Sequence, residues 1–230
     1  MSVAILEYRD VTVRYERNRP PTIVGVSFAI QPGERVALLG LNGSGKTTLL
    51  ASAAGLVSHD GDILFDGLFV TAKTLSYVRS RTGYLFSVPE NQLLFPGVLD
   101  DVAFGMTKRG CSSKEARVRA LQILETLGVA RLAESDVYEL SRGEKQRVAL
   151  AGVLVLSPSL LILDEPSASL DPPGRRALAS TLRSQKTAMV IATHDIAFAD
   201  SLCTRFLTLS GGRIVYDGSD SLEATRFWET

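Results

Sequence analysis

Hydrophobic and polar residues alternate along the first third of the chain in the manner of short strands. Two such stretches within residues 3–30, AILEYRDVTVRY and TIVGVSFAI, are separated by Asn18–Pro21, which is typical of a turn. ERVALLG (Glu34–Gly40) predicts a buried strand that runs into a glycine-rich loop. GDILFDG (Gly61–Gly67), which ends in an Asp-Gly turn, and TGYLFS (Thr82–Ser87) predict two more strands.

The middle of the chain has a helical pattern instead. One helix is predicted from about Lys46 to Ala54, directly after the glycine-rich loop. From Val88 to Leu156 the pattern is mainly helical. Within this segment, a capping box of Ser112 and Glu115 begins an amphipathic helix, and Gly128 is a suitable residue to end it.

Strand character returns after Pro158. LLILDEP (Leu160–Pro166), AMVIATH (Ala188–His194) and FLTLSGGRIVYDG (Phe206–Gly218) each contain a short run of apolar residues bounded by turn residues or charge. Strands that alternate with helices indicate an α/β fold. The helical middle segment is therefore predicted to be an insertion in an α/β core.

Composition narrows the class of protein. The chain has 230 residues, of which 45% are apolar and 22% charged, as in ordinary globular domains. Lysine plus arginine equals aspartate plus glutamate, 25 each, which argues against bulk binding of nucleic acid. Cys111 and Cys203 match no metal spacing and are expected to be reduced thiols. We expect no targeting segment, and the longest apolar run, Val148–Leu156, is too short to cross a membrane.

GLNGSGKT, between the first buried strand and the first helix, fits the phosphate-binding pattern G-x-x-x-x-G-K-[ST]. Its glycines let successive backbone N–H groups face a phosphate. Lys46 would bridge the β- and γ-phosphates, and Thr47 would bind Mg²⁺. Chance produces such a match in roughly one chain of this length in a hundred, and the strand–loop–helix context makes chance rarer still. The predicted nucleotide-binding residues here are Gly40, Leu41, Asn42, Gly43, Ser44, Gly45, Lys46, Thr47 and Thr48.

LLILDE supplies the second half of such a site. Its four apolar residues predict a buried strand that delivers Asp164 to the magnesium ion, while Glu165 would orient or deprotonate the attacking water. His194 ends the following strand and could contact the γ-phosphate, because the ends of parallel strands gather at a ligand site. A strand that merely ends in acidic residues, and a structural histidine, are the alternatives. The nearby Lys46 favours the catalytic interpretation.

LSRGEKQRVAL (Leu140–Leu150) begins like a capped helix, with Ser141 and Glu144 forming a capping box. Its first turn also carries Arg142 and Gly143. Positive charge there opposes the helix dipole, and glycine costs about 1 kcal/mol relative to alanine. A plain capped helix accounts for Ser141 and Glu144 but not for Gly143, so an anion site is the favoured interpretation.

With these motifs in this order, the chain resembles the ATP-binding cassette (ABC) ATPases over nearly its whole length, and LSRGEKQ resembles their LSGGQ signature. The resemblance implies a P-loop NTPase fold: one domain, 1–230, made of a RecA-like core with an antiparallel β subdomain (1–87 and 157–230) and a helical subdomain (88–156). In this family two cassettes pack head to tail and enclose ATP and Mg²⁺ between the P-loop of one and the signature of the other.

The resemblance assigns roles to individual residues. Tyr15 matches the aromatic residue that stacks on adenine, with an ordinary strand tyrosine as the alternative; stacking of this kind contributes about 1–3 kcal/mol. SASLD (Ser167–Asp171) resembles the D-loop that crosses the dimer interface, with a simple turn as the alternative. The implied nucleotide contacts beyond the P-loop are Tyr15, Ser141, Arg142, Gly143, Glu144 and Asp171; the implied metal ligands are Thr47, Asp164 and Ser87; the implied catalytic residues are Lys46, Glu165 and His194.

A closer resemblance lies in GYLFSVPENQLLFPGVLDDVAFG (Gly83–Gly105), which is similar to energy-coupling-factor (ECF) transporter ATPases. These import vitamins, cobalt or nickel. The resemblance implies a second ABC ATPase, an integral-membrane coupling subunit and a substrate-binding membrane subunit as partners, at the cytoplasmic face of the membrane. The apolar residues Leu93, Leu94, Phe95 and Phe104 predict the docking surface, with an ordinary surface loop as the alternative.

Two residues depart from the family pattern. Ser87 replaces the Q-loop glutamine, a magnesium ligand in the family, and reaches less far; Gln92 matches a second family glutamine and does not take over this role. Arg142 replaces the first signature glycine, and we expect it to add a guanidinium near the phosphates or the partner's D-loop. The chain also ends soon after the last predicted strand, where many relatives carry an extension that helps dimerisation.

Two other functions fit parts of the sequence. A non-transport ABC ATPase in DNA repair or translation is opposed by the absence of sustained heptads between the P-loop and the signature, and by the single set of motifs. A weakly hydrolysing regulatory cassette is supported by Ser87 and opposed by the intact Lys46, Asp164, Glu165 and His194. The cargo is open between vitamins and cobalt or nickel, with the short chain favouring biotin, and the dimer is either homotypic or formed with a paralogue.

Overall fold

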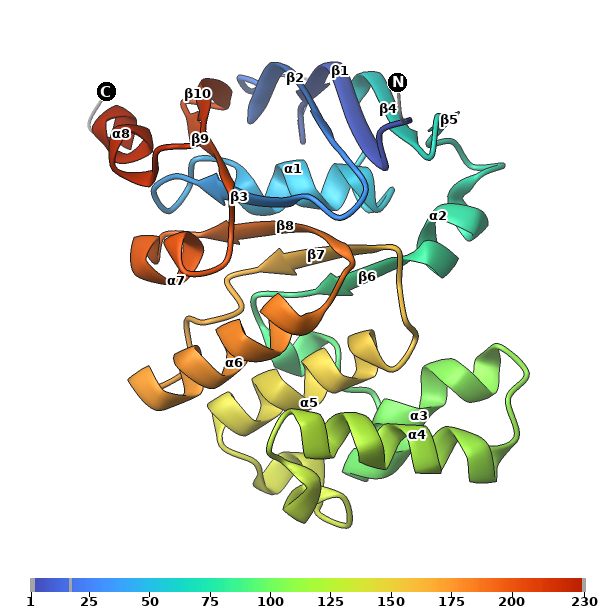
Figure 1. The fold of residues 1–230 in the computed structure, drawn as a ribbon. Coiled ribbons are helices and arrows are strands. Elements are labelled where there is room, and N and C mark those ends of the chain that lie inside the picture. The colour runs from blue at the N-terminus through green and yellow to red at the C-terminus, as the bar shows by residue number, and fades with distance from the viewer. Residues whose placement is uncertain (1–2, 17, 229–230) are drawn as a thin grey trace.

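The computed structural model describes residues 3–16 and 18–228, and it contains two sheets with helices between and below them (Figure 1). The larger sheet has six strands in the order β10-β9-β3-β8-β7-β6. The strands are β3 (Arg35–Leu39), β6 (Thr82–Leu85), β7 (Leu160–Asp164), β8 (Ala188–Thr193), β9 (Arg205–Ser210) and β10 (Arg213–Gly218). All neighbouring pairs are parallel except β9 and β10, which form a hairpin.

The smaller sheet is antiparallel, with the order β2-β1-β4-β5. Its strands are β1 (Leu6–Val13), β2 (Ile23–Ile30), β4 (Asp60–Phe65) and β5 (Leu68–Phe69). The predicted Asp-Gly turn is confirmed: Asp66 and Gly67 both have positive φ (50° and 76°), as a two-residue hairpin turn between β4 and β5 requires. Gly211 and Gly212 do the same between β9 and β10.

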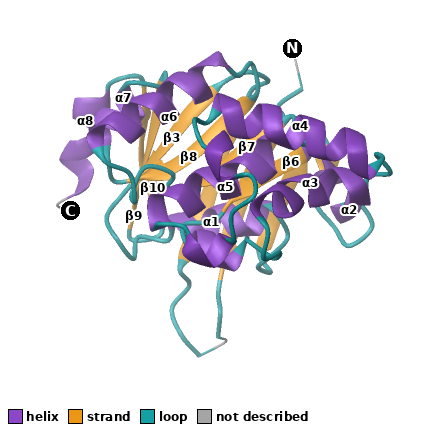
Figure 2. Ribbon diagram, turned by 90° about the horizontal axis from the view of Figure 1, so that it is seen from below, coloured by secondary structure: helices purple, strands orange, loops and turns teal. Residues whose placement is uncertain are grey.

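Helices fill the space between the sheets and cover the other face of the larger one. Helix α1 (Lys46–Ala53) lies between the two sheets, whereas α5 (Arg142–Leu154) and α6 (Pro172–Ser184) lie below the parallel strands (Figures 1 and 2). The remaining helices are α2 (Leu75–Arg81), α3 (Val98–Lys108), α4 (Ser113–Thr126), α7 (Ile196–Asp200) and α8 (Ser221–Thr225), with short 3₁₀ turns at 89–91, 130–132, 137–139 and 226–228.

This layering explains why the parallel strands are apolar throughout. Alternate residues of β3 point into different cores: Val36 and Leu38 pack with α1 and the antiparallel sheet, while Ala37 and Leu39 pack with the helices below. A strand covered on both faces has no polar side. Each core is continuous, so the parallel strands are held from both sides.

Between β6 and β7 the chain is helical, with α3, α4 and α5 packed on one another. The predicted start of α4 is confirmed, because the Ser112 hydroxyl accepts from the Glu115 N–H at 3.2 Å, and Gly128 follows its end with positive φ. Of the predicted capping box only this half forms, since the Glu115 carboxylate accepts from Arg119 at 2.8 Å instead. Among the described residues, no helix has the length and apolar character needed to span a bilayer.

Several elements were not predicted from the sequence, and α6 is the most important of them. Its signal is nevertheless local: the Asp171 carboxylate accepts from the Gly174 N–H at 2.9 Å, and Pro172 and Pro173 occupy the first turn. Aspartate at the N-cap followed by proline is a typical helix start. The short helices α2, α7 and α8 have too few turns to show a clear period.

Gly83 in β6 tests the packing of the parallel sheet on α5. A Cβ there would lie 2.5 Å from Val153 Cγ1 and 2.9 Å from Pro158 Cγ. Gly83→Ala should therefore lower the free energy of unfolding by about 1–3 kcal/mol through overpacking, as measured by urea denaturation. Gly152→Ala in α5 is the control: a Cβ there meets nothing within 4 Å, so stability should rise by up to about 1 kcal/mol. Equal effects of the two substitutions would contradict the packing account.

Candidate functional site

The loop between β3 and α1 is shaped by its glycines to hold an anion. Gly40, Gly43 and Gly45 all have positive φ, and a Cβ on Gly40 would lie 2.5 Å from the Leu209 carbonyl oxygen. The buried Lys46 ammonium curls back and donates to the carbonyls of Gly40 (2.8 Å) and Leu41 (3.2 Å). The Lys46 ammonium therefore lies within the loop. Its positive charge and the backbone N–H groups of the loop together suit a phosphate.

Asp164, at the end of β7, lies beside this loop. Its Oδ2 accepts from the Thr47 hydroxyl at 2.8 Å, while its Oδ1 is buried and has no partner among the described residues. Burial is the main cause that raises the pKa of this carboxyl, and hydrogen bonds from Thr47 and Ser87 work against it. A buried carboxylate with a free oxygen next to two hydroxyls fits a Mg²⁺ ion, which prefers oxygen ligands.

The same donor set limits what such a metal site would be. In the described part of the chain, no group of three or more His, Cys, Asp or Glu side chains could hold a metal ion. Magnesium bound by Thr47, Asp164 and Ser87 would therefore take its other ligands from phosphate oxygens and water, as is common at nucleotide sites.

Glu165 connects the ends of β7 and β8. Its Oε1 lies 3.7 Å from Lys46 Nζ and 3.0 Å from His194 Nδ1, and its Oε2 accepts from the Thr193 hydroxyl at 3.2 Å. Its backbone has a positive φ of 48°, which is strained for a non-glycine residue, and its N–H donates to the Ala192 carbonyl. In this conformation the carboxylate lies beside Lys46 of the phosphate-binding loop.

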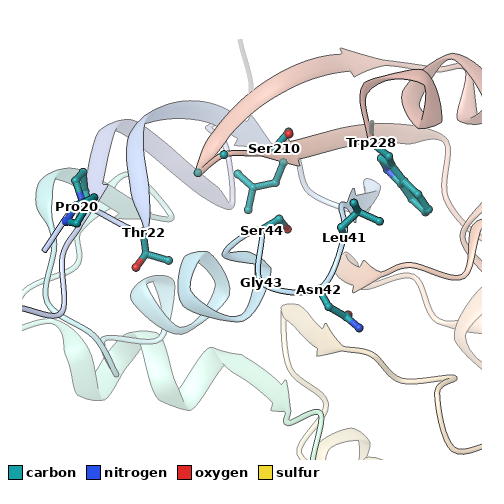
Figure 3. Close-up of a pocket in the computed structure, with 12 residues that line it drawn as sticks. Pro20, Thr22, Leu41, Asn42, Gly43, Ser44, Ser210 and Trp228 are labelled. Atoms are coloured by element: carbon teal, nitrogen blue, oxygen red, sulfur yellow. The ribbon is translucent and has the colours of Figure 1, made fainter. Parts of the chain in front are cut away.

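These side chains surround a cavity of about 490 Å³. Its lining residues are Thr22, Asn42, Gly43, Gly45, Lys46, Thr47, Thr48, Ser87, Asp164 and Glu165. A second cavity, of about 540 Å³, shares Thr22, Asn42 and Gly43 with it and extends past Leu41 to Trp228 (Figure 3). The phosphate-binding loop is thus open to solvent on two sides.

Tyr15 lies at the edge of this region. Its side chain is 63% exposed, and its hydroxyl is 3.0 Å from the Thr48 hydroxyl at the start of α1. Its stacking on adenine stays a prediction. Gln92, by contrast, accepts from the Phe86 N–H and donates to the Ala149 carbonyl, so it links the segment after β6 to α5.

The signature segment forms the predicted capped helix. The Ser141 hydroxyl and the Glu144 carboxylate complete a capping box, and Arg131 donates to Glu144 at 2.5 Å. Hydrogen bonds from Ser141 and then from Arg131 lower the pKa of Glu144 to about 2. Arg142 is exposed. None of these residues is among those that line the two cavities around the phosphate-binding loop.

Gly143 has a structural reason that the sequence did not reveal. A Cβ at this position would lie 3.0 Å from the Ser169 carbonyl oxygen and 3.4 Å from Leu170 Cδ2. The helix start therefore packs closely against the 167–171 loop of the same chain. This packing is a second reason for glycine here, beside the anion site expected from the sequence, which stays a prediction.

Asp195 and Arg175 join this loop to the end of β8, and sequence reasoning missed both. Arg175 donates to the Leu170 carbonyl at 3.0 Å and to Asp195 Oδ2 at 3.1 Å, and Ser167 donates to the same carboxylate at 3.4 Å. Asp195 also caps α7. Its place next to His194 was the available signal.

The fold and this site define a P-loop nucleoside triphosphatase: a phosphate-binding loop between β3 and α1, and at the end of β7 a buried aspartate followed by a partly buried glutamate. The profile of the ABC transporter family matches residues 23–168. The chain belongs to the ABC transporter family of ATP-hydrolysing, ATP-binding cassettes.

Individual relatives agree with this assignment. An ABC transporter ATP-binding protein of Geobacter sulfurreducens is 42% identical over 95% of this chain and 88% of its own length. An energy-coupling factor transporter ATP-binding protein of Levilactobacillus brevis is 40% identical over 94% of this chain and 78% of its own.

Solved structures agree as well. The cbiO1 subunit from Clostridium perfringens, part of the ABC transporter complex cbiONQ, superposes with a TM-score of 0.84 and 33% identity over 97% of this chain and 91% of its own. A dimeric ATP-binding cassette in a post-hydrolysis state, bound to ADP and Pi, gives 0.86 and 26% over 93% and 98%. The expected P-loop NTPase fold and the resemblance to ABC and ECF ATPases are thereby confirmed.

Asp164→Asn tests the electrostatic state of the site. The amide keeps the shape and can still accept from Thr47, but it removes a carboxylate whose charged form is disfavoured by burial. The melting temperature of the nucleotide-free protein should stay level or rise at neutral pH, and the additional rise caused by Mg²⁺ with ATP should disappear. A lower melting temperature together with a retained Mg²⁺ response would contradict this account.

Proposed function

We propose that this cassette is the ATP-hydrolysing subunit of an energy-coupling-factor type importer. The observation that carries the enzymatic part is the convergence of Lys46, Asp164 and Glu165 on one cavity. The importer part is supported by the 40% identity to an energy-coupling factor transporter ATP-binding protein across 94% of this chain. The cargo would be a vitamin, with biotin favoured, or a cobalt or nickel ion.

In this proposal, phosphate oxygens of a bound nucleotide would replace the partners that the Lys46 ammonium has in this structure. When the β- and γ-phosphates enter the loop, the Lys46 ammonium leaves the Gly40 and Leu41 carbonyls and binds phosphate oxygens. Magnesium held by Thr47, Asp164 and Ser87 would neutralise phosphate charge. Freed from Lys46, the Glu165 carboxylate can accept a proton from the attacking water, and His194 orients that carboxylate from its other side.

The remaining predicted contacts would come from a second cassette, either another copy of this chain or a paralogue. Ser141, Arg142, Gly143 and Glu144 do not reach the phosphate cavities of their own chain. Within one chain they therefore have no nucleotide to bind. A head-to-tail partner would bring its own Ser141 helix and its Asp171 loop to this P-loop, while Tyr15 stacks on adenine. The proposed function involves no nucleic-acid partner.

The docking surface for the membrane partner is proposed to surround Leu94. This side chain is 70% exposed, and the loop that carries it is held by Asp101, which accepts from the Leu94 N–H at 2.6 Å and the Phe95 N–H at 2.9 Å. The Phe95 and Phe104 rings pack 4.8 Å apart beside it, while Leu93 packs against the core. An exposed apolar side chain on a loop held by hydrogen bonds is suited to contact a cytoplasmic helix of an integral-membrane coupling subunit.

Such a partner would place the cassette at the cytoplasmic face of the membrane as a peripheral subunit. The coupling subunit would in turn hold a substrate-binding membrane subunit, so the cassette itself would not touch the cargo. Closure of two cassettes on ATP and their opening after hydrolysis would move the Leu94 surface and the helix docked on it.

Glu165→Gln tests the proposed chemistry. The amide cannot take a proton from water, so ATP turnover should fall by at least about 10²-fold. ATP binding, followed by the thermal shift, should persist, and an ATP-bound dimer should accumulate in size-exclusion chromatography. Wild-type turnover already at background, with normal ATP binding, would favour the regulatory cassette, for which Ser87 is the supporting feature.

Leu94→Ser tests the docking surface separately from the chemistry. Tagged protein recovered from detergent-solubilised native membranes should bring along a polytopic membrane protein and a small membrane subunit, identified by mass spectrometry. Leu94→Ser should lose them and keep its ATPase activity. Leu222→Ser, equally exposed at 74% on α8, is the matched control and should keep both. Recovery of DNA-repair or ribosomal partners instead would contradict the importer proposal.

A further inference from the structure

A cavity of about 440 Å³ lies between α6 and α7, away from both cavities at the phosphate-binding loop, with which it shares no lining residue. Ala179 and Phe198 form part of an apolar wall. Three arginines, Arg175, Arg176 and Arg183, contribute from α6. The size is within the range of small-molecule sites.

The charges in this cavity do not balance. Asp195 is the single carboxylate among the lining residues, and it faces three guanidinium groups. Arg175 is paired with Asp195, and Arg183 donates to the Ser201 carbonyl, which carries no charge. Arg176 has no hydrogen-bond or ion-pair partner among the described residues, and it is exposed. Two positive charges therefore remain uncompensated.

The spacing of the arginines concentrates this charge. Residues 175, 179 and 183 are separated by four positions and so lie along one face of α6, with residue 176 beside them. Guanidinium groups bind carboxylates and phosphates through paired N–H donors, and several groups that line one cavity suit a ligand with two negative charges. Arg176 and Arg183 supply such donors at the mouth of an otherwise partly apolar pocket.

We propose that this cavity is a regulatory site for a small dianion with a short apolar body, either a phosphate monoester or a dicarboxylate. The anion would be held by Arg176 and Arg183, and the apolar body would lie against Ala179 and Phe198. The site is separate from the one that binds ATP, so both can be occupied together.

Occupation of this site is coupled to the ATPase through Arg175. This side chain ties the Leu170 carbonyl, next to Asp171, to Asp195, next to His194. An anion held by Arg176 and Arg183 also lies in the cavity that Arg175 lines, so it competes with Asp195 for the Arg175 guanidinium. Loss of the tie loosens the loop that precedes α6 and the segment that carries His194, so the rate of ATP hydrolysis changes when the site fills.

The test uses phenyl phosphate and phthalate as probes, with inorganic phosphate as the comparison, on the full-length protein saturated with Mg²⁺ and ATP analogue so that the P-loop is occupied. Isothermal titration should detect binding of at least one aromatic probe, more tightly than inorganic phosphate. Arg176→Ala should weaken it by at least about 10-fold, as expected for loss of a charged hydrogen-bonding group. Arg213→Ala, on the exposed strand β10, is the control and should bind normally.

The activity arm measures ADP formation from Mg²⁺-ATP with and without the tighter probe. At a probe concentration equal to the wild-type dissociation constant, the rate should change in the wild type and Arg213→Ala, and most of the change should be lost in Arg176→Ala. Binding that disappears when the P-loop is filled, equal weakening by Arg213→Ala, or no binding of either aromatic probe would overturn the proposal. Binding without any change in ADP formation would overturn the coupling through Arg175.

Discussion

The parallel pairing of β3, β8 and β7 is the constraint on which the site depends. Leu39 at the end of β3 is aligned with Thr193 on β8, and Ala192 on β8 with Asp164 on β7. Because the strands run in the same direction, the segments that follow them leave the sheet at one edge. Lys46, Glu165 and His194, which are far apart in the sequence, meet there for this reason.

Three side chains at this edge of the sheet lie in unusual electrostatic or conformational environments. Asp164 is buried with one oxygen unpartnered, Glu165 is held in a strained backbone conformation, and the Lys46 charge is balanced by carbonyls and a carboxylate at 3.7 Å. The unpartnered Asp164 oxygen and the strained Glu165 backbone oppose stability, whereas the contacts of Lys46 compensate its buried charge. A magnesium ion bound with a nucleotide would supply the partner that the free Asp164 oxygen lacks, and phosphate oxygens would accept from Lys46.

Much of the fold was predictable because its signals are local. Apolar runs bounded by turn residues predicted the parallel strands, and glycine patterns predicted the phosphate-binding loop and the turn between β4 and β5, whereas the turn at Gly211 and Gly212 that divides β9 from β10 was not predicted. The shortest helices carried too little pattern to be seen. Helix α6 was not predicted, although an N-cap aspartate, Asp171, followed by two prolines is a typical helix start. The residues proposed for catalysis followed from the motifs, and the structure places those of the P-loop and of β7 and β8 around a single cavity or beside it.

What could not be predicted involves contacts between distant segments. Gly143 packs closely against a carbonyl in the 167–171 loop, and Arg175 meets Asp195 twenty residues away. Neither contact leaves a periodic trace in the sequence. The signature helix illustrates the same limit, because its start was predicted and its position in the fold was not. Its cap was visible in four residues, whereas the distance between that helix and its own phosphate-binding loop depends on the whole fold.

The most direct test of the central claim, that the edge formed by β3, β7 and β8 binds and hydrolyses Mg²⁺-ATP, is steady-state phosphate release by the purified protein and by Lys46→Ala. Hydrolysis should require Mg²⁺ and should fall by at least about 10²-fold in the variant, because a positioned cation stabilises the charge that develops on the phosphates. Equal rates in the two proteins would contradict the claim, since the hydrolysis would then occur elsewhere.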